Sequence, residues 1–304
     1  MHKDGVITTI SHKTNPLEIL LLKSSDYLQL IKLRLTLLVV FSAGMGYLFA
    51  VSAPIGWSHF SLLLLSGFLI TGSANGINQI IERDLDKLMS RTANRPVAAG
   101  RLHPAEAVML TGLMGIAGVT VLSVYMNTIS ALLGLFALLS YAFVYTPLKR
   151  FTPLAVVAGA FPGALPTIIG YTAISGTIDI ACIAIFAIQF VWQFPHFWAI
   201  AWLWDDDYKK AGFNLLPVKG EKNKQTGLVV FLSTVFLIPV CTFPLLSNLV
   251  NIYAGFAMVA LSLVFLYFSY IVYRDCSLQA AKRLLLASIT YLPVIQLILV
   301  FGKI

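Results

Sequence analysis

The segment NQIIERDLD, residues 78–86, places oxygen-bearing side chains at helical spacing. An α-helix has about 3.6 residues per turn, so Asn78, Glu82 and Asp86 are expected to share one face. Stacked carboxylates repel each other, and Mg²⁺ relieves that repulsion because it prefers hard oxygen ligands and commonly bridges them to phosphate. The spacing therefore predicts that these three residues bind Mg²⁺ and take part in catalysis. Asp84 points away from their face unless the helix has ended, so it is a secondary candidate.

A second acidic group, Asp205, Asp206 and Asp207, follows a long apolar segment that contains His196. If one helix runs through both, Asp207 lies within about 20° of His196, with Asp206 to one side. Two acidic helix faces at equivalent depths predict a pair of metal sites around one anionic ligand. Asp206 and Asp207 are then metal ligands, and Asp207 and His196 are candidate catalytic residues. The plainer alternative for both groups is a solvated helix end with its carboxylates paired to nearby basic side chains.

Basic side chains accompany both acidic groups and indicate what the anion is. Arginine pairs bidentately with phosphate, and Mg²⁺ supplies further neutralisation of charge. The implied ligand is a diphosphate, and without a Gly-rich P-loop a nucleoside triphosphatase has no support. The predicted diphosphate-binding residues are Arg91, Arg95, Lys149, Arg150 and Lys209.

The elements that must position these residues are membrane-spanning helices. Of the 304 residues, 58% are hydrophobic and 11% are charged, whereas a soluble domain has about 25% charged residues. Apolar runs of about 20 residues recur, each long enough to cross about 30 Å of hydrocarbon as a helix. We therefore expect an all-α, polytopic membrane protein with about nine transmembrane helices bundled around a central cavity. The expected spans are residues 35–54, 58–81, 105–124, 128–145, 153–172, 178–203, 226–246, 252–273 and 283–301.

Charge along the chain predicts two segments and an orientation. Residues 1–34 are expected to form an N-terminal lead and an interfacial helix, because apolar and charged residues alternate at roughly helical spacing from Leu17 to Arg34. Residues 35–304 are expected to form the intramembrane domain. Of the 21 basic residues, 20 fall on the side of the N-terminus and only Lys303 falls on the other. The positive-inside rule then predicts that the N-terminus and the active site face the cytoplasm across the cytoplasmic (inner) membrane.

Two other functional classes fit less well. The formal charge of +8 could suggest nucleic acid, but no soluble domain is expected that could carry a basic stripe, so no nucleic-acid partner is predicted. A proton-coupled transporter would relay protons through buried carboxylates near the middle of the membrane. The carboxylates of this chain fall at span ends, which favours an enzyme.

From about residue 32 to the last span, the sequence resembles the UbiA-type intramembrane prenyltransferases. The family's first motif, N-x-x-x-[DE]-x-D-x-D followed by M-x-R-T-x-x-R-P, is matched by Asn78, Glu82, Asp84, Asp86, Met89, Arg91, Thr92, Arg95 and Pro96. Further matches are YTPLKR at residues 145–150 and DDYKKAGFNLLP at residues 206–217. A K-x-R match adds Lys32 and Arg34 as secondary site residues. QFPHFW at residues 193–198 is typical of the branch whose prenyl acceptor is haem B.

The resemblance implies a reaction and its participants. A farnesyl group would pass from farnesyl diphosphate to a vinyl group of haem B, with addition of water, to give haem O and diphosphate. Mg²⁺ is the implied cofactor, haem B is a substrate, and a downstream haem-modifying enzyme is a candidate partner. A quinone or other aromatic acceptor is the alternative. His196 stays open between a structural hydrogen bond, a ligand to haem iron and a base that directs the water.

Overall fold

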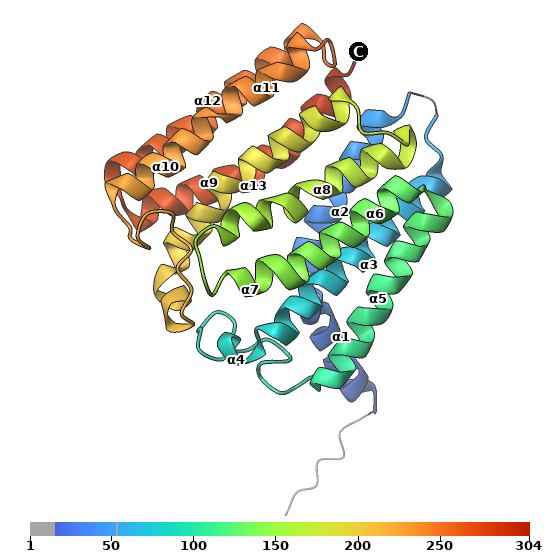
Figure 1. Cartoon of the computed structure of the whole chain (residues 1–304), viewed down its shortest axis with the longest axis vertical. Coiled ribbons are helices and arrows are strands. Elements are labelled where there is room, and N and C mark those ends of the chain that lie inside the picture. Colours follow the sequence, from blue (N-terminus) through green and yellow to red (C-terminus); the bar gives the residue numbers. More distant parts are fainter. Residues whose placement is uncertain (1–15, 53) are drawn as a thin grey trace, which may run out of the picture.

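The computed structural model describes residues 16–52 and 54–304, and their regular structure is helical (Figure 1). In chain order the helices are α1 Pro16–Leu30, α2 Leu33–Ala50, α3 Trp57–Ile81, α4 Arg83–Asp86, α5 Pro104–Tyr125, α6 Thr128–Leu139, the π-helix η1 Ser140–Tyr145, α7 Thr146–Leu148, α8 Ala155–Ser175, α9 Ile180–Lys210, α10 Lys224–Val235, α11 Leu237–Leu246, α12 Ile252–Asp275 and α13 Leu278–Gly302. Several begin at a side chain that accepts a hydrogen bond from a free backbone N–H of the first turn, among them α6 at Asn127, α9 at Asp179 and α13 at Ser277.

Nine helices in the described part of the chain are long and apolar enough to cross a bilayer. One span, residues 128–148, is built from α6, η1 and α7, and another, residues 224–246, from α10 and α11. These observations confirm the predicted all-α membrane fold. The largest difference from the predicted limits is at the end of α9, which continues to Lys210 instead of stopping near residue 203. The predicted lead, residues 1–15, lies outside the described residues.

The end of α9 is helical because its carboxylates pair with lysines about one turn away. Asp205 contacts Lys209 at 2.8 Å, and Asp207 contacts Lys210 at 2.8 Å. Trp204 interrupts the helix just before them, with non-helical angles of φ −110° and ψ 17°. The predicted angle between His196 and Asp207 assumed one continuous helix, so the break at Trp204 removes its basis.

Helices α2 and α8 cross with their backbones in close contact. A Cβ atom at Gly46 would lie 2.1 Å from the carbonyl oxygen of Thr167, and one at Gly170 would lie 1.8 Å from that of Ala43. Only glycine permits such an approach. Small residues at helix crossings are the usual way that membrane helices pack, because lipid provides no hydrophobic drive between them. The crossing holds α8 in the centre of the bundle, where it is the most enclosed of the nine described spans.

We expect Gly170→Ala to destabilise the folded protein by about 1–3 kcal/mol, because the added methyl group must separate two backbones. The midpoint of thermal unfolding of the purified protein in detergent measures the change. Gly112→Ala on α5 is the matched control, since a Cβ atom there meets nothing within 4 Å. Equal midpoints for the two variants would contradict the close crossing.

One end of the bundle carries the connections that contain the predicted site residues. Figure 1 shows α1, α4 and the extension of α9 at the lower end, and the C-terminus at the upper end. We call the lower end the charged end and define it as residues 82–103, 149–154 and 205–223. Ion pairs attach α1 beside it, from Asp26 to Arg101 at 2.8 Å and from Lys23 to Glu106 at 3.1 Å.

Candidate active site

The first acidic group lies buried where α3 gives way to α4. Asn78 is in the last turn of α3, Glu82 follows that helix with φ −91° and ψ 4°, and Asp86 ends α4. The predicted continuous helix is thus interrupted at Glu82. All three side chains are nevertheless buried, with exposed fractions of 1%, 4% and 0%. Carboxylates are almost never this buried unless they are paired.

Basic side chains from three other segments provide those partners. Arg95 donates from Nη1 to both carboxylate oxygens of Asp86 at 2.8 Å. Lys149, which follows α7, forms an ion pair with Glu82. Lys32, between α1 and α2, donates to the Asn78 side-chain oxygen at 3.0 Å. We call these six residues the buried cluster: Lys32, Asn78, Glu82, Asp86, Arg95 and Lys149.

Lys32 reaches the cluster from an uncommon backbone conformation. Its φ of 50° and ψ of 58° lie in the left-handed region, which costs energy for a residue other than glycine. Such outliers persist where a function needs the side chain in that place. Lys32 was predicted only as a secondary site residue, but the structure places its ammonium group against Asn78.

Basic groups outnumber carboxylates in the buried cluster. Three basic groups face two carboxylates within it. Burial lowers the pKa of Lys32 well below its ordinary value, and the nearby charges of Arg95 and Lys149 lower it further. Burial also raises the pKa of the Asp86 carboxyl, against the opposing effect of Arg95. An anion bound here would relieve the repulsion among the three basic groups.

A π-helix fixes the orientation of the Asn78 amide. In η1 the chain takes one extra residue per turn, and the Thr146 hydroxyl donates to the carbonyl oxygen of Tyr141, five residues earlier, at 2.9 Å. The Thr146 oxygen then accepts from Nδ2 of Asn78 at 3.2 Å. Because Nδ2 is held by Thr146, Oδ1 is turned toward Lys32 and the rest of the buried cluster. The sequence prediction missed Thr146, although it stands three residues before Lys149.

The donor atoms of the buried cluster fit Mg²⁺. Asn78, Glu82 and Asp86 offer hard oxygens, and Mg²⁺ is commonly held by one or two carboxylates together with waters and phosphate oxygens. Among the described residues no group of three or more His, Cys, Asp and Glu side chains forms a metal site by itself. The fit is therefore to a metal that is shared with a phosphate ligand rather than to a cage made only of protein.

The second acidic group has different surroundings. Asp207 is buried, and it accepts hydrogen bonds from the backbone N–H of Ser90 at 3.2 Å and of Arg91 at 3.1 Å. It also accepts from the Ser90 hydroxyl at 2.9 Å and from Lys210 at 2.8 Å. Asp206 is 85% exposed and contacts Lys222 at 3.3 Å. The structure therefore does not bring Asp206 and Asp207 together around one point.

Asp207 joins the two parts of the charged end that carry the predicted motifs. The N–H groups it holds belong to the segment after α4, and the acceptor itself belongs to α9. Arg91 is further placed by Tyr208, to whose hydroxyl it donates at 3.3 Å, and by the ring of Trp204, 5.6 Å from the guanidinium carbon. The sequence prediction missed Ser90 and Tyr208, because nothing in either local segment indicates contact with the other.

The remaining predicted site residues lie at the surface. Asp84 is exposed and pairs with Lys87 at 2.9 Å, and Lys209 pairs with Asp205 at 2.8 Å. Arg34 and Arg150 are exposed, and neither forms an ion pair with another residue of the described chain. These two arginines are thus free to contact a ligand or lipid headgroup, but the structure does not place them in the buried cluster.

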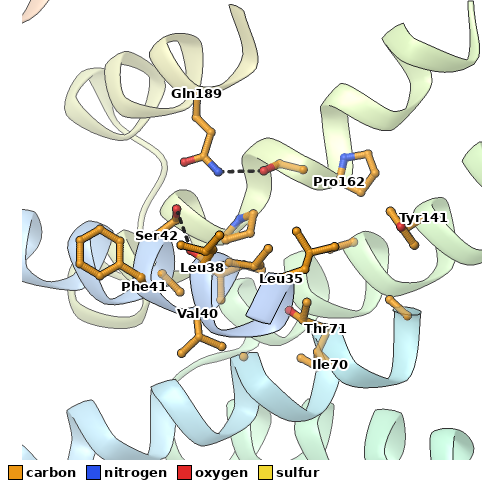
Figure 2. A pocket seen from close by; sticks show the side chains of 18 of the residues that line it. Leu35, Leu38, Val40, Phe41, Ser42, Ile70, Thr71, Tyr141, Pro162 and Gln189 are labelled. Atoms are coloured by element: carbon orange, nitrogen blue, oxygen red, sulfur yellow. Dashed lines mark hydrogen bonds between the residues drawn. The ribbon is translucent and has the colours of Figure 1, made fainter. Parts of the chain in front are cut away.

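An apolar cavity of about 250 Å³ lies in the bundle next to the buried cluster. Leucine, isoleucine and valine side chains from α2 and α3 form much of its wall, and Gln189 from α9 points toward it with Ser42 opposite (Figure 2). Asn75 and Tyr145 also line it, and each stands about one turn from a cluster residue, Asn78 or Lys149. The cavity therefore lies about one helical turn from the buried cluster.

His196 lines this cavity from α9. Its ring stacks on Trp192, with ring centroids 4.5 Å apart and planes inclined by 19°. Its Nδ1 lies 2.7 Å from the hydroxyl oxygen of Ser288 on α13. His103 and His59 are elsewhere, since His103 caps the start of α5 and His59 contacts Tyr47. A buried polar cluster close to an apolar cavity suits a molecule with a charged head and a long apolar tail.

Comparison with known proteins agrees with that geometry. The sequence profile of the UbiA prenyltransferase family matches residues 38–290. A protohaem IX farnesyltransferase from Cytophaga hutchinsonii is 44% identical over 278 residues, which cover 91% of this chain and 97% of the relative. Another, from Flavobacterium johnsoniae, is 38% identical over 284 residues, which cover 91% of this chain and 94% of the relative.

Solved structures share the fold at low sequence identity. A digeranylgeranylglyceryl phosphate synthase superposes with a TM-score of 0.77 at 16% identity, covering 92% of this chain and 98% of the other. A UbiA homologue from Archaeoglobus fulgidus bound to GPP and Mg²⁺ superposes with a TM-score of 0.69 at 16% identity, covering 88% and 99% of the two chains.

Proposed function

Since this chain belongs to the UbiA prenyltransferase family, we propose that it transfers a farnesyl group from farnesyl diphosphate to a vinyl group of haem B, with addition of water, to give haem O and diphosphate. The observation that carries the prenyl-transfer step is the buried cluster, in which basic groups outnumber carboxylates, about one helical turn from the lining of an apolar cavity. The choice of farnesyl and haem rests on relatives named for that reaction, among them one at 44% identity and one at 38% identity.

In this proposal the diphosphate head binds at the buried cluster. Lys32, Arg95 and Lys149 neutralise charge that grows on the leaving diphosphate, and Arg91 is held nearby by Asp207 and Tyr208. Bound Mg²⁺, which Asn78, Glu82 and Asp86 would hold, supplies further charge neutralisation of the phosphate oxygens. Arg150 is next to Lys149 in the sequence and Lys209 is two residues from Asp207, so both could add positive charge near the diphosphate. Asp206 is the remaining candidate metal ligand.

The bond changes follow from this placement. The bond between farnesyl C1 and the diphosphate oxygen breaks, and its electron pair leaves with diphosphate. The terminal carbon of the haem vinyl group forms a bond to C1, which leaves a cation on the vinyl carbon next to the porphyrin. Water adds to that carbon and loses a proton, so a hydroxyl group results. The apolar cavity keeps other water away from the allylic cation until the carbon–carbon bond has formed.

The location of the reaction is part of the same proposal. Among the described residues, every Lys and Arg except Lys303 belongs to α1 or to the helix ends and connections on the side of the bundle that contains the buried cluster. The positive-inside rule then places that end, together with the N-terminus, at the cytoplasmic face of the inner membrane. Farnesyl diphosphate would reach the cluster from the cytoplasm, while haem B would enter the apolar cavity.

The proposal is tested by incubating the purified protein in detergent with haem B, farnesyl diphosphate and Mg²⁺. The expected product is a haem whose mass has increased by one farnesyl group and one hydroxyl group, detected by mass spectrometry, together with one diphosphate per product. A parallel incubation replaces haem B with an aromatic acid or quinone precursor. If a prenylated aromatic product forms and no modified haem does, the acceptor is an aromatic compound and not haem B. The assignment as a prenyltransferase would still hold.

Thr146→Val should raise the Mg²⁺ concentration needed for half-maximal turnover about 10-fold, because Asn78 loses the hydrogen bond that turns its oxygen toward the site. Turnover measured over a Mg²⁺ titration at saturating farnesyl diphosphate gives this quantity. Thr146→Ser keeps the hydroxyl group and should stay close to the wild-type value. A Mg²⁺ requirement that is equal in the valine and serine variants would contradict the role of Thr146.

A further inference from the structure

The Ser288 hydroxyl determines which nitrogen of His196 carries the proton. Ser288 lies on α13, and its hydroxyl donates to the carbonyl oxygen of Leu285 at 2.6 Å. With its own proton used in this way, the Ser288 oxygen is an acceptor for the N–H of His196 Nδ1, 2.7 Å away. The neutral imidazole therefore carries its proton on Nδ1 and a free electron pair on Nε2.

Nε2 of His196 is available to a ligand in the cavity. It forms no hydrogen bond with any other described residue. It is also absent from the fully enclosed polar atoms that have no partner, so its surface is partly accessible from the cavity. The ring is also held in one orientation, because Trp192 stacks against it and donates from Nε1 to the backbone oxygen of Ser288 at 2.9 Å. The electron pair is thus fixed in direction before any ligand arrives.

The cavity favours a metal ligand over a base at this position. None of the side chains that line it is Asp, Glu, Lys or Arg. A base becomes a cation when it takes a proton, and in this apolar wall no carboxylate would stabilise the imidazolium. An imidazole that binds a metal stays neutral. Metal-binding histidines also usually donate their second N–H to an oxygen acceptor, which is the arrangement that Ser288 provides here.

We propose that Nε2 of His196 binds the iron of the haem substrate as an axial ligand, and that Ser288 is the positioning residue that orients and polarises the ring. The proposal rests on the proposed function in one respect, that the acceptor is a haem. The iron–nitrogen bond would hold the porphyrin against α9 and so limit which of its edges can face the prenyl donor at the charged end. A metal-free porphyrin would lack this anchor.

Equilibrium binding of ferric haem B to the purified chain, without farnesyl diphosphate, tests the axial bond. The expected result is an absorption and electron paramagnetic resonance spectrum of imidazole-ligated iron, and binding at least 10-fold tighter than that of metal-free protoporphyrin IX. His196→Ala should lose the imidazole signature and the preference for haem over protoporphyrin. Added imidazole should restore the signature, because it can occupy the space that the missing ring leaves.

The role of Ser288 has its own readout. In the ferrous protein the iron–imidazole stretching frequency, measured by resonance Raman spectroscopy, reports how strongly the Nδ1 proton is hydrogen-bonded. Ser288→Ala should lower that frequency and weaken haem binding about 10-fold, while Ser288→Thr should keep both near the wild-type values. Ser233→Ala on α10 is the matched control, since it removes a serine hydroxyl that donates only to a carbonyl of its own helix, at 2.7 Å.

The outcomes separate this proposal from the proposed function. An imidazole signature that is absent from the wild type, or unchanged in His196→Ala, would overturn the axial bond even if farnesylated haem forms. In the case of an unchanged spectrum with lost turnover, the ring acts on the reaction rather than on the iron. Conversely, a signature that depends on His196 without any prenylated haem product would support the iron site and contradict the proposed reaction.

Discussion

Asp86→Ala is expected to reduce the rate of prenyl transfer by about 100–1,000-fold or more. Asp86 is fully buried and is held by Arg95 through two hydrogen bonds of 2.8 Å. Its loss removes one of the two carboxylates that would hold Mg²⁺ and also releases the arginine that would face the diphosphate. Steady-state formation of prenylated product at saturating Mg²⁺ and farnesyl diphosphate measures the effect.

The same substitution leaves the half-buried guanidinium of Arg95 without its partner, and removal of one member of a fully buried ion pair costs about 3–5 kcal/mol, which is an upper bound here. Lost folding and lost chemistry must therefore be separated. The double variant Asp86→Asn with Arg95→Gln removes both charges while it keeps the shape of the pair. We expect its thermal unfolding midpoint to lie above that of Asp86→Ala and its turnover to be equally low. Turnover near that of the wild type in Asp86→Asn alone would refute the role of this carboxylate.

Asp207→Ala is expected to lower kcat/KM for farnesyl diphosphate by about 100-fold or more. The physical reason is the set of hydrogen bonds from Ser90, Arg91 and Lys210 that converge on this carboxylate. Without them the segment after α4 is no longer attached to the end of α9, and the guanidinium of Arg91 loses its fixed position. The rate as a function of farnesyl diphosphate concentration provides the measurement.

The dependence on Mg²⁺ decides how Asp207 acts. If Asp207 only holds the segment that carries Arg91, its substitution raises KM for farnesyl diphosphate and leaves the half-saturating Mg²⁺ concentration unchanged. We expect this result, because Asp207 already accepts hydrogen bonds from four protein donors. A higher Mg²⁺ requirement would support the metal role that the sequence predicted. Asp275→Ala is the control, because Asp275 pairs with Arg274 in a different, exposed connection.

The membrane fold could be predicted from the sequence because each span is recognisable from its own local run of apolar residues. A run of about 20 apolar residues has few alternatives to a transmembrane helix. The span that begins at Ile252 was predicted at that residue, and the first helix of the bundle differs from its prediction by a few residues at each end. The prediction failed at the end of α9 because charged residues normally indicate the end of a span, whereas here they pair along the helix.

The buried cluster could be predicted only in part. Local spacing indicated that Asn78, Glu82 and Asp86 belong together, and they do lie buried in one region. It could not indicate that Glu82 pairs with Lys149, 67 residues away along the chain, because such a contact depends on how the helices pack. Lys32 was undervalued for the same reason. Its position depends on a left-handed turn, and a lysine gives no sequence signal for that conformation.

For the second acidic group, Asp205, Asp206 and Asp207, closeness in the sequence was a poor guide to shared function. A row of three aspartates suggested shared chemistry, but neighbours in sequence on a helix end face different directions. Asp206 is solvated, while Asp205 and Asp207 are buried against different partners. The break at Trp204 could not be foreseen, since tryptophan is not a residue that usually interrupts helices.

The break at Trp204 has a consequence for how such enzymes diversify. It divides α9 into a deep part, whose Gln193 and His196 face the cavity, and a terminal part, whose Asp207 holds the charged end. Because the helical phase is not continuous across Trp204, a substitution that shifts or rotates the deep part need not rotate the terminal part. Acceptor preference can therefore change separately from prenyl-donor binding. We expect exchange of residues 180–203 between relatives to alter acceptor preference while it preserves prenyl-donor binding.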